Sequence, residues 1–198
     1  EKSTVNTNCE GTTSLSVSVE EQPNPVISGG TPVCSGSTQT YSVTAVPGHT
    51  YNWSITGLAA DRTITTSVTG SSMSVTWNNA GSYTVSVLQT NNSGNCSRTA
   101  TLVVTVQQTP TATAITRVSG TPLNQACNGE TISYSTPANG ASSYLWTVVG
   151  GSINGTATAN VVSVTWQTVG NNTITVTETT TGTPCFKTVT QNVAVSST

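Results

Sequence analysis

Charged side chains are rare in this sequence: they make up only 6% of its 198 residues, and the formal net charge is −2. A surface that binds the nucleic-acid backbone must be basic, so the composition argues against a nucleic-acid partner. Long apolar runs are also missing, which argues against direct insertion into a membrane. The first ten residues, EKSTVNTNCE, are polar and do not resemble a signal peptide.

Histidine and carboxylate side chains, which act as general acids and bases, are almost as scarce. The chain has one histidine, His49, and one aspartate, Asp61. Glu130 and Glu178 have no counterparts in the first half of the chain, so no pair of carboxylates recurs with the repeat described below. His49 follows the turn-forming letters VPG, and we expect it to be a solvated turn residue rather than a general base. The sequence therefore predicts no enzyme, no catalytic residue and no cofactor.

Serine, threonine and valine are abundant. Serine and threonine together make up about a third of the chain, and valine alternates with polar residues along several stretches. No stretch has the 3.6-residue period of an amphipathic helix. Disordered chains can also be rich in serine, but four tryptophans and the regular valine alternation indicate buried cores. The predicted fold class is all-β.

The sequence repeats itself. A cysteine precedes a tryptophan by the same interval in both halves of the chain, and a second tryptophan precedes a second cysteine by an equal interval. The letters SVTW also occur twice, and a glycine follows each of their tryptophans four residues later. These spacings predict two domains, residues 23–107 and 108–197, joined through QQTPTA. The anchors of the repeat are Cys34, Trp53, Trp77 and Cys96 in the first copy, and Cys127, Trp146, Trp166 and Cys185 in the second.

A third, partial copy stands at the beginning of the chain. Cys9 precedes Val19 by ten residues, as Cys96 precedes Val106 and as Cys185 precedes Val195. Residues 1–20 therefore read as the last strand of a preceding repeat, and we expect the natural polypeptide to continue before Glu1. The alternative is that this strand completes the open sheet of a neighbouring subunit, as in strand donation. Cys9 is expected to be unpaired within this chain.

Each repeat reads as a small β-sandwich of about seven short strands separated by turn signals. The alternation places Tyr51, Trp53 and Ile55 on one face of a strand, and the same phase recurs in the other strands. All four tryptophans are predicted to lie in the cores: Trp53, Trp77, Trp146 and Trp166. The outward faces consist mainly of Thr, Ser and Asn.

Five cysteines in a β-rich chain indicate an oxidising compartment. With one histidine and no CxxC pair, zinc is not expected, and the metal prediction is none. The simplest pairing is one disulfide per repeat, Cys34–Cys96 and Cys127–Cys185. Five strands separate the two cysteines of each repeat, however, and an odd number tends to place them at opposite ends of a sandwich. A bond between the domains, Cys34–Cys185, is the alternative.

The letters YNWSITG, SVTWNNAGSYTVSV and NCSRTATLVVTV, preceded by ISGGTPVCSGSTQTYSV, carry a resemblance to a known family. They resemble the PKD-like and Ig-like tandem repeats of large Bacteroidota surface proteins, and the resemblance covers nearly the whole chain twice. It implies a β-sandwich spacer or adhesive module, exported by the type IX route in proteins used for gliding and attachment. The acidic FGDG-type turn of PKD domains in the narrow sense is absent after Trp53 and Trp146.

Together these features predict a non-enzymatic extracellular protein at the bacterial cell surface, part of the stalk, shaft or filament of a large adhesin. Its partners would be adjacent repeats of the same chain and identical neighbouring chains. The alternative is a module that binds surface glycans through exposed aromatic rings. Phe186 has no aromatic counterpart in the other repeat, and we expect it to be exposed. No particular ligand-binding residue can be predicted.

Overall fold

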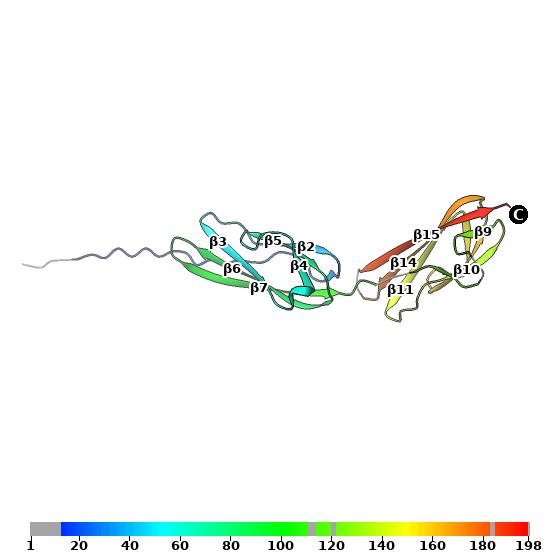
Figure 1. Cartoon of the computed structure of the whole chain (residues 1–198). Helices are drawn as coiled ribbons and strands as arrows, with labels where there is room; N and C mark the ends of the chain where they lie inside the picture. The colour runs from blue at the N-terminus through cyan, green and yellow to red at the C-terminus, as the bar shows by residue number, and fades with distance from the viewer. Residues whose placement is uncertain (1–12, 111–113, 120–121, 183–184, 198) are drawn as a thin grey trace, which may run out of the picture.

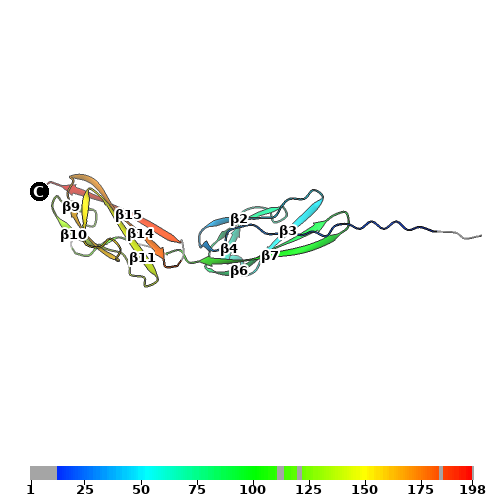
Figure 2. The same cartoon turned by 180° about the vertical axis from the view of Figure 1, so that it is seen from behind.

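The structure is a computed structural model, and it describes residues 13–110, 114–119, 122–182 and 185–197. Two β-sandwiches lie end to end along the chain, and the C-terminus lies at the far end of the second one (Figure 1). The view from behind shows the same elongated arrangement (Figure 2). The predicted all-β, sandwich-type fold is confirmed, because the helix found among the described residues is the single 3-10 turn η1, Ala59–Asp61. A helix able to cross a bilayer is absent from the described ranges.

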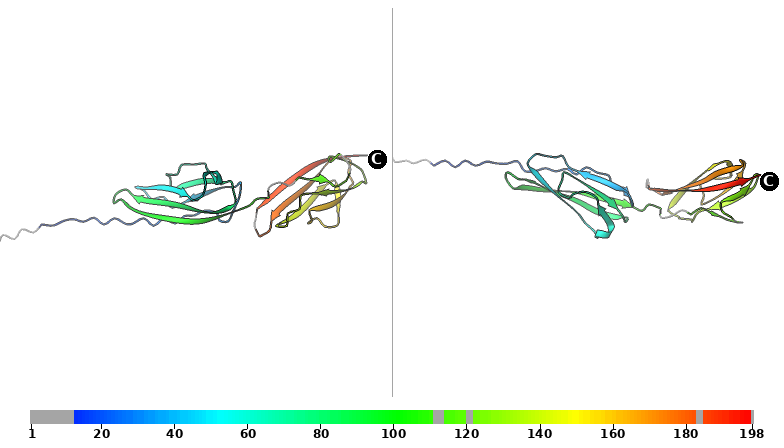
Figure 3. Two further views of the ribbon diagram at one scale, coloured as in Figure 1. Left: turned by 60° about the horizontal axis from the view of Figure 1, so that its bottom comes forward. Right: turned by 45° about the horizontal axis from the view of Figure 1, so that its top comes forward.

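The first domain packs a sheet of three strands against a sheet of four (Figure 3). The smaller sheet has the order β2-β5-β4, and the larger has the order β1-β7-β6-β3. The strands are β1 (Val33–Cys34), β2 (Thr38–Ser42), β3 (His49–Ile55), β4 (Arg62–Ile64), β5 (Ser72–Trp77), β6 (Gly81–Asn91) and β7 (Cys96–Gln107).

The second domain repeats this topology. Its sheets have the orders β12-β13-β10-β8 and β11-β14-β15-β9. The strands are β8 (Thr116–Arg117), β9 (Gln125–Cys127), β10 (Thr131–Ser135), β11 (Ser142–Val149), β12 (Gly151–Asn154), β13 (Val161–Trp166), β14 (Gly170–Thr180) and β15 (Phe186–Ser196). In the first domain β8 is replaced by an isolated bridge between Ser28 and Ser42.

The short strands β1 and β9 lie at equivalent positions, each at the end of its domain from which the chain leaves. Each pairs in parallel with the last long strand of its own domain, whereas the pairs between the long strands are antiparallel. Cys34 is aligned with Gln107, and Cys127 is aligned with Ser196. The first cysteine of each repeat is therefore placed beside the point where the chain leaves that domain.

The four tryptophans expected in the cores are buried, with exposed fractions between 0% and 4%. The indole N–H groups of two of them are satisfied in the same way in the two domains. Trp77 donates to the Tyr41 hydroxyl at 3.1 Å, and Trp166 donates to the Tyr134 hydroxyl at 3.0 Å. Burial raises the pKa of both tyrosines above the usual value, although the hydrogen bond from the indole opposes the shift.

The cores of the two domains differ at the position next to these Trp–Tyr pairs. Tyr83 stacks on Trp77 with ring centroids 4.9 Å apart, whereas Asn172 takes the corresponding place in the second domain. The buried Asn172 amide donates to the carbonyl oxygens of Thr168 and Gly170. Gly150, at φ +83°, leaves the room for this side chain, because a Cβ there would lie 1.7 Å from Asn172 Oδ1.

Residues 13–22 precede the first domain and form no strand. The three apolar side chains of this segment are largely exposed: Leu15 by 88%, Val17 by 74% and Val19 by 89%. They are the residues expected to face inward in the last strand of a preceding repeat. Cys9 lies outside the described residues.

Candidate functional site: the disulfide junction between the domains

A disulfide bond joins the two domains. It links Cys34, at the end of β1, to Cys185, immediately before β15, with Cα atoms 5.6 Å apart and 151 residues of separation in the chain. Cys96 and Cys127 are free thiols. The favoured pairing, Cys34–Cys96 and Cys127–Cys185, is therefore wrong, and the alternative bond between the domains is the one that forms.

The topology explains why a bond within either domain does not form. Cys34 lies on β1 beside Gln107, at the end of its domain from which the chain leaves. Cys96 is the first residue of β7 and is paired with Asn91, at the opposite end of the same long hairpin. Nearly the whole length of β7 separates the two positions, about 35 Å of extended chain. A disulfide requires Cα atoms within about 7 Å.

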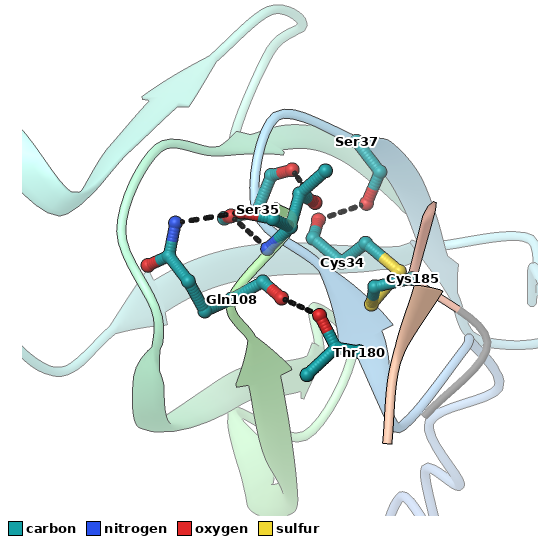
Figure 4. The surroundings of a disulfide bond; sticks show 7 residues. Cys34, Ser35, Ser37, Gln108, Thr180 and Cys185 are labelled. Atoms are coloured by element: carbon teal, nitrogen blue, oxygen red, sulfur yellow. Dashed lines mark hydrogen bonds between the residues drawn. A yellow bond between two sulfur atoms is a disulfide. The ribbon is translucent and has the colours of Figure 1, made fainter. Parts of the chain in front are cut away.

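The linker between the domains forms hydrogen bonds with both of them (Figure 4). On the side of the first domain, the Thr109 backbone N–H donates to Ser35 Oγ at 2.9 Å, and Thr109 Oγ1 donates to the Ser35 carbonyl oxygen at 2.7 Å. On the side of the second domain, Thr180 Oγ1 donates to the Gln108 carbonyl oxygen at 3.2 Å. Pro110, which follows, is buried. The junction thus combines a covalent bond with a hydrogen-bonded linker.

A cavity of about 400 Å³ lies at the opposite end of the first domain, where residues 20–26 enter it. His49 and Gln89 line this cavity, and His49 Nδ1 lies 2.7 Å from Gln89 Nε2. Gln89 is 3% exposed, and His49 begins strand β3. The expected solvated turn histidine is therefore a half-buried strand residue that contacts a buried amide.

Several of the charged residues have structural partners. Asp61 accepts hydrogen bonds from the Leu58 backbone N–H and from Asn79. Glu130 forms an ion pair with Arg117 and accepts a hydrogen bond from the Cys127 backbone N–H at 2.8 Å. Among the described residues, no group of three or more His, Cys, Asp or Glu is placed to hold a metal ion.

Phe186 is 62% exposed, next to the disulfide cysteine Cys185. The remaining exposed large apolar side chains are aliphatic and are scattered over several strands, the loops and the segment before the first domain. Its ring stands alone on the surface, because the tryptophans and tyrosines of the chain are buried.

The sequence of the first domain matches a known family. Residues 20–106 match the PKD-like domain family, and this match covers less than half of the chain. Among curated proteins, none matches the sequence.

Several solved structures align with most of this chain at low sequence identity. One is a SusE-like, surface-located polysaccharide-binding protein from the Bacteroides thetaiotaomicron heparin utilisation locus, at 14% identity and a TM-score of 0.40. The alignment covers 84% of this chain but only 33% of that protein. The fibronectin(III)-like modules of Clostridium thermocellum CbhA are 15% identical, with a TM-score of 0.40 and coverage of 87% and 95%. A C-terminal intimin fragment is 16% identical, with a TM-score of 0.45 and coverage of 88% and 64%.

Proposed function

We propose that this chain is a structural segment of the stalk or shaft of a large bacterial surface adhesin, with no catalytic role of its own. The observation that supports this most directly is the junction, because Cys34 and Cys185 bond two successive sandwiches end to end. A spacer must hold its domains in line, and a second covalent connection beside the linker restricts bending between them.

The disulfide also supports a location outside the cytoplasm, because such bonds persist in oxidising compartments. The outer strand faces suit a spacer in water: Thr175 pairs with Thr190 and Thr177 pairs with Thr188 through hydroxyl hydrogen bonds between β14 and β15. Threonine favours strands and is solvated without charge. The partners in this proposal are adjacent repeats of the same chain.

Two alternatives have specific observations in their favour. The exposed Phe186 favours a carbohydrate- or surface-binding module. The exposed Leu15, Val17 and Val19 favour a filament subunit that donates its first segment to the open sheet of a neighbour.

A glycan array, with a cellulose pull-down, tests the proposal against binding. We expect no saturable binding by the intact chain, and the Phe186→Ala variant should behave identically. Binding that Phe186→Ala abolishes would contradict a pure spacer and favour the binding module.

Small-angle X-ray scattering tests the shape. The intact chain should scatter as one elongated particle, and the Cys34→Ser/Cys185→Ser variant should show a broader distribution of distances between the domains. A compact particle would contradict the shaft, and concentration-dependent growth that is lost on deleting residues 1–20 would favour strand donation.

A further inference from the structure

We propose that Cys96 and Cys127 are the two open ends of a head-to-tail disulfide chain, in which each domain is bonded to the one before it and to the one after it. This inference rests on the proposed function as a repeat of a shaft. The partner is in each case a further PKD-like repeat. A following repeat would bring a cysteine at the Cys185 position to Cys127, and a preceding repeat would bring one at the Cys34 position to Cys96.

The surroundings of Cys127 repeat those of Cys34. The turn after Cys34 is closed by hydrogen bonds from Ser35 N to the Gln107 carbonyl and from Gly36 N to the Trp77 carbonyl. After Cys127 the same two bonds run from Asn128 N to the Ser196 carbonyl and from Gly129 N to the Trp166 carbonyl. Cys127 is a free thiol and is exposed, whereas Cys34 is bonded to the second domain.

The surroundings of Cys96 likewise repeat those of Cys185. Each cysteine stands at or next to the start of the last long strand of its domain. The hairpin tip before it, between β6 and β7 or between β14 and β15, begins with an equivalent backbone hydrogen bond. Asn92 N donates to the Gly48 carbonyl at the first tip, and Thr181 N donates to the Ala141 carbonyl at the second. Cys96 and Cys185 therefore lie at the same end of their domains, the end where the chain enters.

The path of residues 20–23, which enter the first domain, supports the same inference independently, because these residues run past Cys96. Residues 20–23 align with residues 107–110 of the linker when Val19 is matched to Val106. Glu20 packs against Gly94 at the first tip, where a Cβ would lie 2.8 Å from the Glu20 Cβ. Gln22 Nε2 lies 3.5 Å from the Ser97 carbonyl oxygen, and Pro23 is buried as Pro110 is.

The residues that enter the first domain therefore contact its hairpin tip, as the linker contacts the second domain through Thr180. A repeat carried on that entering segment would occupy the position that the first domain takes relative to the second. Its β1-type cysteine would then face Cys96, as Cys34 faces Cys185.

The bond-forming step is ordinary thiol oxidation. Two thiols, one from each repeat, lose two protons and two electrons and form one S–S bond. A low-molecular-weight disulfide such as oxidised glutathione accepts the electrons by exchange through a mixed disulfide and is released as two thiols. Cys34–Cys185 requires the same oxidant.

A tandem chain tests the inference. Val195 of one copy is joined to Glu20 of a second, which preserves the register because Val195 and Val19 are equivalent, and Cys9 of the first copy is changed to Ser. After oxidation with glutathione disulfide, peptide mapping without reduction should find Cys127 of the first copy joined to Cys96 of the second. The two outermost cysteines, Cys96 of the first copy and Cys127 of the second, should remain alkylatable.

The bond Cys34–Cys185 inside each copy reports that the tandem chain has folded. With Cys127→Ser in the first copy as the matched control, Cys96 of the second copy should become alkylatable and nothing else should change. The inference is overturned if both junction thiols stay free while Cys34–Cys185 forms, if Cys96 pairs with Cys127 of its own copy, or if Cys34–Cys185 itself does not form. Failure of Cys34–Cys185 to form would also remove the main support for the proposed function, whereas free junction thiols beside an intact Cys34–Cys185 would overturn this inference alone.

Discussion

Removal of the disulfide between the domains should lower the stability of whichever domain unfolds first. The comparison uses a background with Cys9, Cys96 and Cys127 changed to Ser, with and without Cys34→Ser/Cys185→Ser. Pro110 divides the separation of 151 residues almost in half, so an unfolded domain is a closed loop of about 75 residues on a folded neighbour. The chain-entropy relation gives about 4 kcal/mol for such a loop.

Urea unfolding followed by tryptophan fluorescence measures this effect, because each domain contains two buried tryptophans. With a slope of about 2 kcal/mol per molar urea, the loss corresponds to a midpoint lower by about 2 M. The same scan under reducing conditions should bring the background protein to the midpoint of the double variant. A midpoint shift below roughly 0.5 M would refute the reasoning, since the bond would then constrain no unfolded loop.

Trp166→Ala should destabilise the second domain by about 3–5 kcal/mol by leaving a cavity, and acrylamide should quench the folded wild-type protein only weakly. Tyr134→Phe should cost about 1–3 kcal/mol in a denaturant titration, because the buried Trp166 N–H loses its acceptor. Burial raises the pKa of Tyr41 and Tyr134, so the stability that their neutral hydroxyls contribute is complete below the unfolded value of 10.0 and is lost as the pH rises through the folded values. A 295 nm titration should therefore show both ionising at a higher pH than the tyrosines of the unfolded chain. Gly150→Ala should lower the thermal midpoint, costing about 1–3 kcal/mol, because its φ is positive and its Cβ would overlap Asn172; an unchanged midpoint would contradict this.

The sequence predicted the strands and the cores because a period of two is a local signal. Valine and tryptophan alternate with threonine and serine in the long strands, so the buried face of β5, for example, is readable from SMSVTW alone. The strands β1 and β9 were not predicted, because two or three residues carry no period. Their parallel pairing with β7 and β15 depends on strands that come at the far end of the same domain sequence.

The disulfide partner could not be derived from either repeat alone. The pairing of Cys34 depends on how the second domain is placed against the first, and that placement is set by the linker and by Thr109 and Thr180. The odd number of intervening strands was the one local indication that the two cysteines of a repeat lie at opposite ends. The contact between His49 and Gln89 was also hidden, because the second repeat has serine and glutamate at the equivalent positions.

The disulfide also determines how the molecule would respond to being pulled by its two ends. Tension entering at Pro23 runs along the chain to Cys34, crosses the sulfur bridge to Cys185 and leaves through β15. The long segment between the two cysteines carries no load on this path, although it includes most of both cores. Without the bridge, unravelling that segment would add roughly 500 Å of contour length; with it, the pair of domains remains nearly inextensible even if a sandwich melts.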